Sequence, residues 1–403
     1  MDETGVLQRR RDTAWRGAGV AVAAVGWGAQ QFAPLLLVYR AELGVGAATV
    51  QAVFAVYVVG LVPGLLFGGP VSDRWGRRPV ALAALAASGA ASALLLAGGH
   101  GVGWLFAGRL VAGFASGAGF SAGAAWVREL SAGSVGGTER GPRRATVAMT
   151  AGFGLGPLAA GVLAQWAPAP TVLPYLPHLA LTLAALPLVL RTPETSAGGT
   201  GGLRIAGVTS RRFRTVVVPL APWVFGVVAV GIAYLPGLVA HRLGGFVLLF
   251  CTFVTLIAAA AGISVVPLAR RVARGGTGQL LAVAMGLAIA GLLVAAAAAA
   301  TTDPLLVVAS VVVLGAAYGC CQVCGLAEVQ RMARPGQLAG LTAAYQAISY
   351  IGFAAALPLA AVDHAVAPPV LLLGLAALAA LTLAGTSRAV RTSTVPEPTL
   401  DSK

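Results

Sequence analysis

The chain has 403 residues, of which 58% are apolar and only 10% charged. Soluble domains are about a quarter charged, so the composition excludes an ordinary water-exposed surface. Because a membrane-spanning helix needs about 20 consecutive apolar residues, the chain has room for about a dozen spans and their loops. We therefore expect an all-α, multi-pass membrane protein.

The formal net charge is +14, with 27 Lys and Arg against 13 Asp and Glu. The basic residues form short clusters between long uncharged runs, which is the pattern of the positive-inside rule and not of a basic nucleic-acid-binding face. No nucleic-acid partner is therefore expected. The four cysteines all lie in apolar runs, so they indicate no disulfide framework and no metal site.

In chain order, the uncharged runs predict twelve transmembrane helices. Each run is long enough to cross a bilayer. The predicted spans are approximately 17 to 39, 48 to 69, 79 to 99, 101 to 127, 145 to 166, 171 to 190, 215 to 240, 243 to 269, 279 to 300, 304 to 327, 338 to 362 and 366 to 385.

The basic residues predict how these spans are oriented. With twelve spans, 24 of the 27 Lys and Arg fall on one side, only Arg40 and Arg242 fall on the other, and Arg109 lies within the fourth span. This asymmetry places both termini in the cytoplasm. The longest interruption is rich in Gly, Ser, Thr and Arg and predicts a linker between two six-helix bundles. The predicted parts are an N-terminal bundle (1–190), a cytoplasmic linker (191–214), a C-terminal bundle (215–387) and a cytoplasmic tail (388–403).

The loop between the second and third spans carries the most specific pattern, at residues 69–79. Asp73 and Arg77 can form a charge-assisted pair, and Gly76 permits a turn that needs a positive φ. The loop closely resembles the G-x-x-x-D-R-x-G-R-R signature of the major facilitator superfamily, in the place where that family carries it. The resemblance implies a switch between conformations that involves Gly69, Asp73, Arg74, Gly76, Arg77 and Arg78.

A second pattern lies in the fourth span, where Arg109 and Gly113 match the R-x-x-x-G motif of the same family. A charge within a span costs roughly 2.5 to 3.5 kcal/mol on insertion scales. Arg109 therefore needs a partner or a wet cavity, unless its side chain extends to the outer interface. The resemblance implies a role for Arg109 in proton coupling or in binding substrate charge.

A third pattern, in the fifth span, resembles the antiporter signature G-x-x-x-G-P-x-x-G-G, which in the family is associated with exporters. Ala160 departs from it where glycine is preferred. Small residues and a proline give a smooth, bendable helix face, and generic helix packing is the alternative interpretation. The matching residues are Gly152, Gly156, Pro157 and Gly161. In the second half of the chain, the loop after the eighth span keeps Arg270, Arg271 and Arg274 but lacks an acid.

Polar residues within spans are candidates for a pathway, because they are costly in lipid and tolerated in a water-filled cavity. No predicted span has a central carboxylate, so the sequence favours neutral or anionic substrates over cations. His178 and His364, near span ends, are expected at the surface or in packing. The candidate cavity residues are Gln30, Gln31, Tyr234, Tyr318, Gln322, Tyr345 and Gln346.

These patterns predict a monomeric secondary active transporter in the inner membrane of a bacterium, working by alternating access. The expected activity is proton-coupled efflux of a small neutral or anionic amphiphile, such as a drug, an antibiotic or a secondary metabolite. The expected partners are the lipid bilayer, the substrate and protons, with no cofactor beyond the proton gradient. No nucleophile, base and orienting group can be assembled, so an enzyme is not expected. Uptake or exchange of a sugar or organic acid is the first alternative, and a non-transporting membrane sensor is the second.

Overall fold

The computed structural model describes residues 13–132, 137–196, 198, 208–334 and 337–392. Within these ranges the regular structure is helical throughout, as the sequence predicts. The α-helices are α2 (Trp15–Gln30), α3 (Leu36–Leu43), α4 (Ala47–Trp75), α5 (Arg77–Leu96), α6 (Val102–Ala132), α7 (Gly137–Trp166), α8 (Leu176–Leu190), α9 (Val218–Ala229), α10 (Leu235–Leu243), α11 (Val247–Ser264), α12 (Val266–Arg274), α13 (Thr277–Thr301), α14 (Pro304–Met332), α15 (Leu338–Ile351), α16 (Ala356–Val362) and α17 (Pro368–Thr392).

Short segments of tighter or wider helix join several of these. The 3-10 segments are η1 (Ala33–Leu35), η2 (Ala97–His100), η3 (Leu173–Tyr175), η6 (Gly244–Phe246) and η7 (Gly352–Ala355), and the π-helical segments are η4 (Phe213–Val217) and η5 (Val230–Tyr234).

Within the described residues, eleven helical segments are long and apolar enough to cross a bilayer. One of them is the run Phe213–Arg274, whose 62 residues include both the seventh and the eighth predicted spans. The first predicted span is a bent helix, because α2 gives way to η1 at Pro34 and resumes as α3. Proline removes a backbone donor and clashes with the preceding turn, which accounts for the break.

The chain divides into two compact units, each with its own interior. The first unit comprises residues 1–203, 232–256 and 356–361, and the second comprises 204–231, 257–355 and 362–403. Two glutamine side chains hold the segment 232–256 within the first unit. Gln51 donates to the carbonyl of Ala233 and Gln165 donates to the carbonyl of Gly245, each at 2.6 Å.

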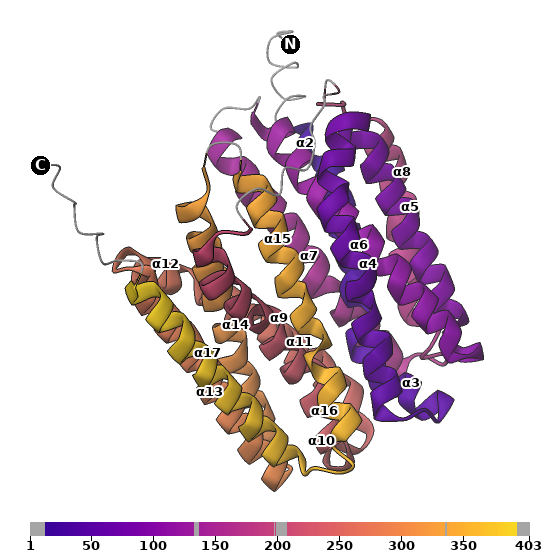
Figure 1. Cartoon of the computed structure of the whole chain (residues 1–403). Helices are drawn as coiled ribbons and strands as arrows, with labels where there is room; N and C mark the ends of the chain where they lie inside the picture. The colour runs from indigo at the N-terminus through magenta and orange to yellow at the C-terminus, as the bar shows by residue number, and fades with distance from the viewer. Residues whose placement is uncertain (1–12, 133–136, 197, 199–207, 335–336, 393–403) are drawn as a thin grey trace, which may run out of the picture. The chain divides into compact units, whose positions relative to one another are not determined.

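Helix α6 is the centre of the first unit and contacts α2, α4, α5 and α7 (Figure 1). Its contact with α4 is made through backbone, because glycines face the partner helix. A Cβ on Gly117 would lie 2.5 Å from the nitrogen of Leu65, and one on Gly64 would lie 2.6 Å from the carbonyl of Phe114. Small residues let membrane helices approach in this way, and the close approach supplies van der Waals contact that lipid cannot replace.

The second unit repeats this principle in α14. A Cβ on Gly315 would lie 2.6 Å from the carbonyl of Ala258 in α11, and Ser310 donates to the carbonyl of Gly291 in α13 at 2.9 Å. An aromatic stack fills the space beside α9. The ring of Phe225 lies 4.2 Å from that of Tyr350 and 4.8 Å from that of Phe353, measured between centroids.

The glycine contacts of α6 lead to a test of stability. We expect Gly117→Val to lower the free energy of unfolding by about 1–3 kcal/mol, the usual cost of overpacking, because the new side chain meets backbone that cannot move aside. Gly103→Val is the matched control, since a Cβ at Gly103 meets nothing within 4 Å on the same helix. Thermal unfolding of the detergent-purified variants measures the difference, and equal melting temperatures would refute the proposed contact.

Candidate functional site

Arg109 lies in the interior of the first unit, with 2% of its surface exposed. Its Nη1 donates to the carbonyl of Ala29 at 3.1 Å, and its Nη2 is 3.5 Å from the carbonyl of Phe54. The last carbonyls of a helix have no intrahelical donor and carry the negative end of its dipole. Because Ala29 is in the last turn of α2, it offers the guanidinium both an acceptor and a favourable field.

Three aromatic rings surround the same guanidinium. The Cζ atom of Arg109 is 4.3 Å from the ring centroid of Tyr57, 5.0 Å from that of Phe32 and 5.6 Å from that of Phe54. Such contacts stabilise a desolvated cation. Among the described residues, no carboxylate lies within 4 Å of Arg109, and its Nε has no hydrogen-bond partner. Arg109 is therefore a buried cation with a donor left over, and its side chain does not extend to the surface.

A polar network crosses the first unit from α2 to α5 and α8. Gln31 Nε2 donates to Ser92 Oγ at 2.7 Å, and Ser92 Oγ lies 2.7 Å from Nδ1 of His178. Nε2 of His178 is 3.0 Å from the carbonyl of Ala24, which identifies Nε2 as the protonated nitrogen and Nδ1 as an acceptor. His178 is fully buried, so of the two expectations for it, packing is the one that holds. The Oε1 of Gln31 has no partner among the described residues.

The predicted switch loop forms an ion-pair network at one end of the first unit. Arg77 pairs with Asp73 at 2.5 Å and with Glu129 of α6 at 2.8 Å, and its Nη1 donates to Ser72 Oγ at 2.6 Å. Gly76, between α4 and α5, has φ = +105°, a conformation that disfavours any side chain. The structure thus brings Asp73, Gly76 and Arg77 together as the motif predicts.

The other residues of the predicted switch are less involved. Arg78 Nη1 donates to the carbonyl of Leu190 at 3.3 Å, Gly69 accepts through its carbonyl from Ser72 Oγ at 2.7 Å, and Arg74 is exposed.

Residues shortly after α8 complete this network, although no motif in the sequence predicts them. We call residues 192–196 the strap. The carboxylate of Glu194 accepts from the backbone N–H of Arg77 at 2.8 Å and of Arg78 at 2.9 Å, so it caps the first turn of α5. Thr195 donates to Glu129, and Ser196 donates to the carbonyl of Asp73 at 2.9 Å.

Two further features define the strap. The indole of Trp126, buried in α6, donates to the carbonyl of Pro193 at 3.0 Å. Burial by itself would raise the pKa of Glu194, but the N–H groups of Ser196, Arg78, Arg77 and Thr195 outweigh it, and the pKa lies below its ordinary value. The feature of the sequence that could have indicated the strap is an acid followed by two hydroxyl residues, shortly after the sixth predicted span.

The glycines of the predicted antiporter-type helix pack against backbone. A Cβ on Gly152 would lie 2.8 Å from the backbone nitrogen of Trp27 in α2. A Cβ on Gly156 would lie 2.7 Å from the carbonyl oxygen of Trp27. Pro157 is buried beside them. Gly161, one turn further on, faces Thr252 of α11, whose Cβ is 2.8 Å from the position of an added Cβ. This part of α7 therefore contacts two different elements through residues that lack side-chain bulk.

The candidate cavity residues divide between the two units. Gln30, Gln31 and Tyr234 belong to the first unit, and Tyr318, Gln322, Tyr345 and Gln346 belong to the second. In the second unit the hydroxyl of Tyr345 lies 3.3 Å from the carbonyl of Cys321 and 3.4 Å from Gln322 Oε1, and Tyr318 packs on Phe225. Gln346 is half-buried, and its Oε1 has no hydrogen-bond partner among the described residues.

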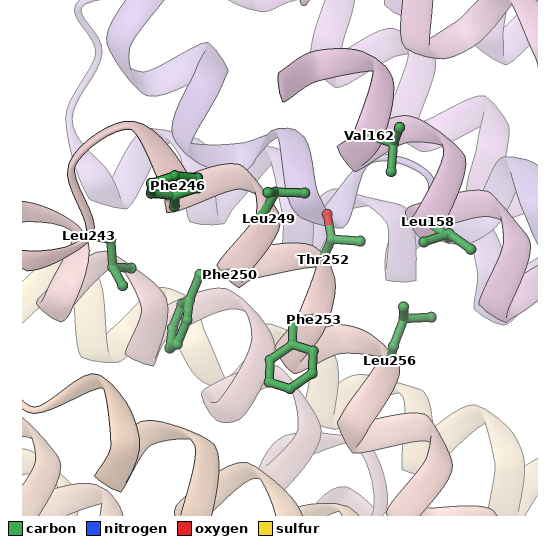
Figure 2. A pocket seen from close by; sticks show the side chains of 9 residues that line it. All are labelled: Leu158, Val162, Leu243, Phe246, Leu249, Phe250, Thr252, Phe253 and Leu256. Carbon is green, nitrogen blue, oxygen red and sulfur yellow. The ribbon is translucent and has the colours of Figure 1, made fainter. Parts of the chain in front are cut away.

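An apolar pocket of about 450 Å³ lies between α7 and the segment 243–256 of the first unit (Figure 2). Its one hydroxyl belongs to Thr252 and is donated to the carbonyl of Leu248 at 2.8 Å. None of the predicted cavity residues lines it, so this pocket is separate from the Arg109 site. Its lining residues are Leu158, Val162, Leu243, Phe246, Leu249, Phe250, Thr252, Phe253 and Leu256.

Comparison with known families agrees with the resemblance of the motifs. Residues 17–357 match the family model of the Major Facilitator Superfamily, and the chain belongs to that family. It is therefore a multi-pass membrane transporter and not an enzyme. No curated protein sequence gives a significant match.

Solved structures show the same fold at low sequence identity. The nucleoside transporter NupG is 11% identical in sequence, with a TM-score of 0.71. The match covers 96% of this chain and 99% of the NupG chain. A POT family transporter in complex with 5-aminolevulinic acid is 12% identical with a TM-score of 0.73, covering 94% and 96%. The human organic anion transporter MFSD10 (TETRAN) is 18% identical with a TM-score of 0.64, covering 94% and 99%.

The packing of α7 can be tested with a pair of substitutions two residues apart. We expect Gly152→Val to impair transport and to lower the melting temperature, because the added side chain meets the backbone of α2. Gly154→Val serves as the control, since nothing lies within 4 Å of a Cβ at that position. Whole-cell flux and thermal unfolding measure the two effects, and equal behaviour of the variants would contradict the packing role.

The cap at Glu194 leads to a pH-dependent prediction. Because the pKa of Glu194 in the folded protein lies below its ordinary value of 4.5, the cap stabilises the protein above that pH and is lost as the pH falls through the folded pKa. We expect Glu194→Gln to unfold more easily at pH 7 by up to about 1 kcal/mol, a typical cap contribution, and to match the wild type at strongly acidic pH. Thermal unfolding across this range measures the difference, and a difference that persisted in acid would rule out the carboxylate cap.

Proposed function

We propose that the protein exports a small neutral or anionic amphiphile in exchange for protons, by alternating access. The observation that carries the proposal is the buried Arg109, which has aromatic rings around it and no carboxylate within 4 Å among the described residues. In a bundle interior, an uncompensated guanidinium attracts an anionic or strongly accepting group. The rings beside it suit the apolar body of the same molecule.

The distribution of acids supports this choice of substrate. Asp73, Glu129 and Glu328 lie near helix ends, and each of the three pairs with an arginine. Among the described residues, no carboxylate is close to Arg109, so a cationic substrate would meet a like charge without compensation. MFSD10, which shares the fold of this chain, is an organic anion transporter, and its substrate class agrees with the proposal.

The proposal that transport is directed out of the cell rests on the glycines of α7. The glycines that resemble the antiporter signature make close backbone contact with α2, which gives the motif a physical role in this chain. The switch loop resembles the family signature in sequence and forms the ion-pair network of Asp73, Arg77 and Glu129. Breaking and re-forming these pairs is the means by which the protein alternates between two conformations in this proposal.

The topology that we propose has twelve crossings, with both termini in the cytoplasm of a bacterial cell. The run Phe213–Arg274 is long enough for two crossings. It reverses at Gly244, whose φ of +51° ends α10. We place one six-helix bundle in residues 1–190 and the other in 215–387, joined by the linker 191–214, and take the protein to act as a monomer driven by the proton gradient.

Uptake or exchange of a metabolite is the second candidate. Two of the similar structures are described as a nucleoside transporter and a POT family transporter, so the fold alone does not fix direction or substrate. A membrane sensor that does not transport is the third candidate, and it would signal without net flux.

Growth inhibition of an efflux-deficient bacterial host, tested with cationic, neutral and anionic antimicrobials, separates these candidates. We expect protection against neutral or anionic compounds, lost in Asp73→Asn because the switch pair with Arg77 is broken. We expect Arg109→Met to lose protection against anions by at least about tenfold, the worth of one charge-assisted hydrogen bond.

Arg40→Gln is the matched control for Arg109, since it removes an exposed arginine from the same unit. Protection against a permanent cation that depends on Arg109 would overturn the assignment of substrate charge. Absence of any protection, with the protein present in the membrane, would favour uptake or exchange, which isotope flux then measures.

A further inference from the structure

Helix α12 is a short basic helix at a membrane boundary. It lies between two apolar helices. Helix α11 ends at Ser264, and helix α13 begins at Thr277. Both neighbours belong to segments long and apolar enough to cross a bilayer. The nine residues between Val266 and Arg274 therefore lie where the hydrocarbon region meets the lipid headgroups.

The residues of α12 are sorted by type around its axis. At about 100° per residue, Arg270, Arg271 and Arg274 fall within an arc of about 100°, and Leu268 and Val272 fall outside it. All three arginines are exposed, and Leu268 is 58% exposed. Ala269 is buried, where α12 packs on α13 and α14 at one end of the second unit (Figure 1). The helix thus has a packed side, a basic side and one uncovered leucine.

The charge of the basic side is not balanced by any ion pair among the described residues. Within the part of the chain that the structure describes, no carboxylate lies within 4 Å of Arg270, Arg271 or Arg274. The acid near the end of α14, Glu328, accepts from Arg212 Nε at 2.8 Å and from its Nη2 at 3.2 Å. This bond is the main reason that the pKa of Arg212 lies above its ordinary value. Glu328 is therefore already paired and does not neutralise α12.

The equivalent loop in the first half of the chain is compensated differently. There Arg77 pairs with two carboxylates, those of Asp73 and Glu129. The loop of α12 retains the arginines and the glycine of that pattern and has lost the acid. A cluster of three uncompensated cations beside an exposed leucine matches the two parts of a phospholipid, the phosphate and the acyl chain.

We propose that α12 binds an anionic phospholipid, with Arg270, Arg271 and Arg274 on the headgroup phosphate and Leu268 against the acyl chains. The guanidinium fork matches the oxygens of a phosphate in geometry as well as charge. Free phosphate would occupy only the arginines, whereas a phospholipid contacts both the arginines and Leu268, so the lipid is the better occupant. This inference is independent of the transported substrate and adds a lipid-binding site to the chain.

Native mass spectrometry of the full-length protein in detergent tests the site. The protein is titrated with phosphatidylglycerol or with phosphatidylcholine of the same chain length. We expect the wild type to retain phosphatidylglycerol preferentially, and each of Arg270→Gln, Arg271→Gln and Arg274→Gln to lower its affinity about fivefold. Leu268→Asn should lower the affinity for phosphatidylglycerol as well, because it removes the acyl contact.

Combining the three arginine substitutions gives a triple variant of α12, and its control is a triple variant of equal charge change, Arg128→Gln with Arg140→Gln and Arg143→Gln. These three arginines are exposed and belong to the first unit. Loss of phosphatidylglycerol by both triple variants to the same extent would reduce the effect to general electrostatic attraction and overturn the site. So would equal retention of the two lipids, or displacement of phosphatidylglycerol by millimolar inorganic phosphate. An unchanged melting temperature in each single variant confirms that folding is intact, and a variant that fails this check is replaced by the corresponding lysine substitution.

Discussion

The close approach of backbone to backbone at glycine is the contact on which this structure depends. Polar side chains are scarce here, and lipid is as apolar as the helices themselves, so burial of apolar surface does not drive the helices together. Contact between the helices therefore depends on close van der Waals packing of complementary surfaces. Gly64 and Gly117 let α4 and α6 touch, Gly152 and Gly156 do so for α7 and α2, and Gly315 does so for α14 and α11. Beside α9, the aromatic stack on Phe225 adds side-chain contact to this packing.

Charge is treated in three ways, which correspond to three different environments. At the loop between α4 and α5, Arg77 is half-buried and has two carboxylates. In the interior of the first unit, Arg109 has two backbone carbonyls and three aromatic faces. On α12 the arginines have no acid within reach among the described residues and are exposed. The less the protein compensates a cation, the more that cation is free to act on something outside the protein.

The sequence predicted the helices better than it predicted their contacts. Long uncharged runs have one stable solution in lipid, because every backbone polar group must be satisfied within the helix, and the all-helical fold and the family followed. The pairing of Asp73 with Arg77 and the positive φ of Gly76 could be predicted because the residue types and their spacing are specific. Glu194 was missed because a single acid after a span resembles any loop residue, and its importance lies in two backbone N–H groups more than a hundred positions away. The buried network of Gln31, Ser92 and His178 was not predicted for the same reason, because no local sequence pattern indicates which helices contact each other.

The strap is the part of the connection between the two halves of the sequence that is hydrogen-bonded to the first unit. Residues 192–196 are bonded to Glu129, to the carbonyl of Asp73 and to the first N–H groups of α5, and the chain then continues toward the second unit. A displacement of the second half that draws on this segment would pull first on the carboxylate that accepts from the N–H groups of Arg77 and Arg78. The covalent connection between the two halves therefore starts from the residues that hold this loop.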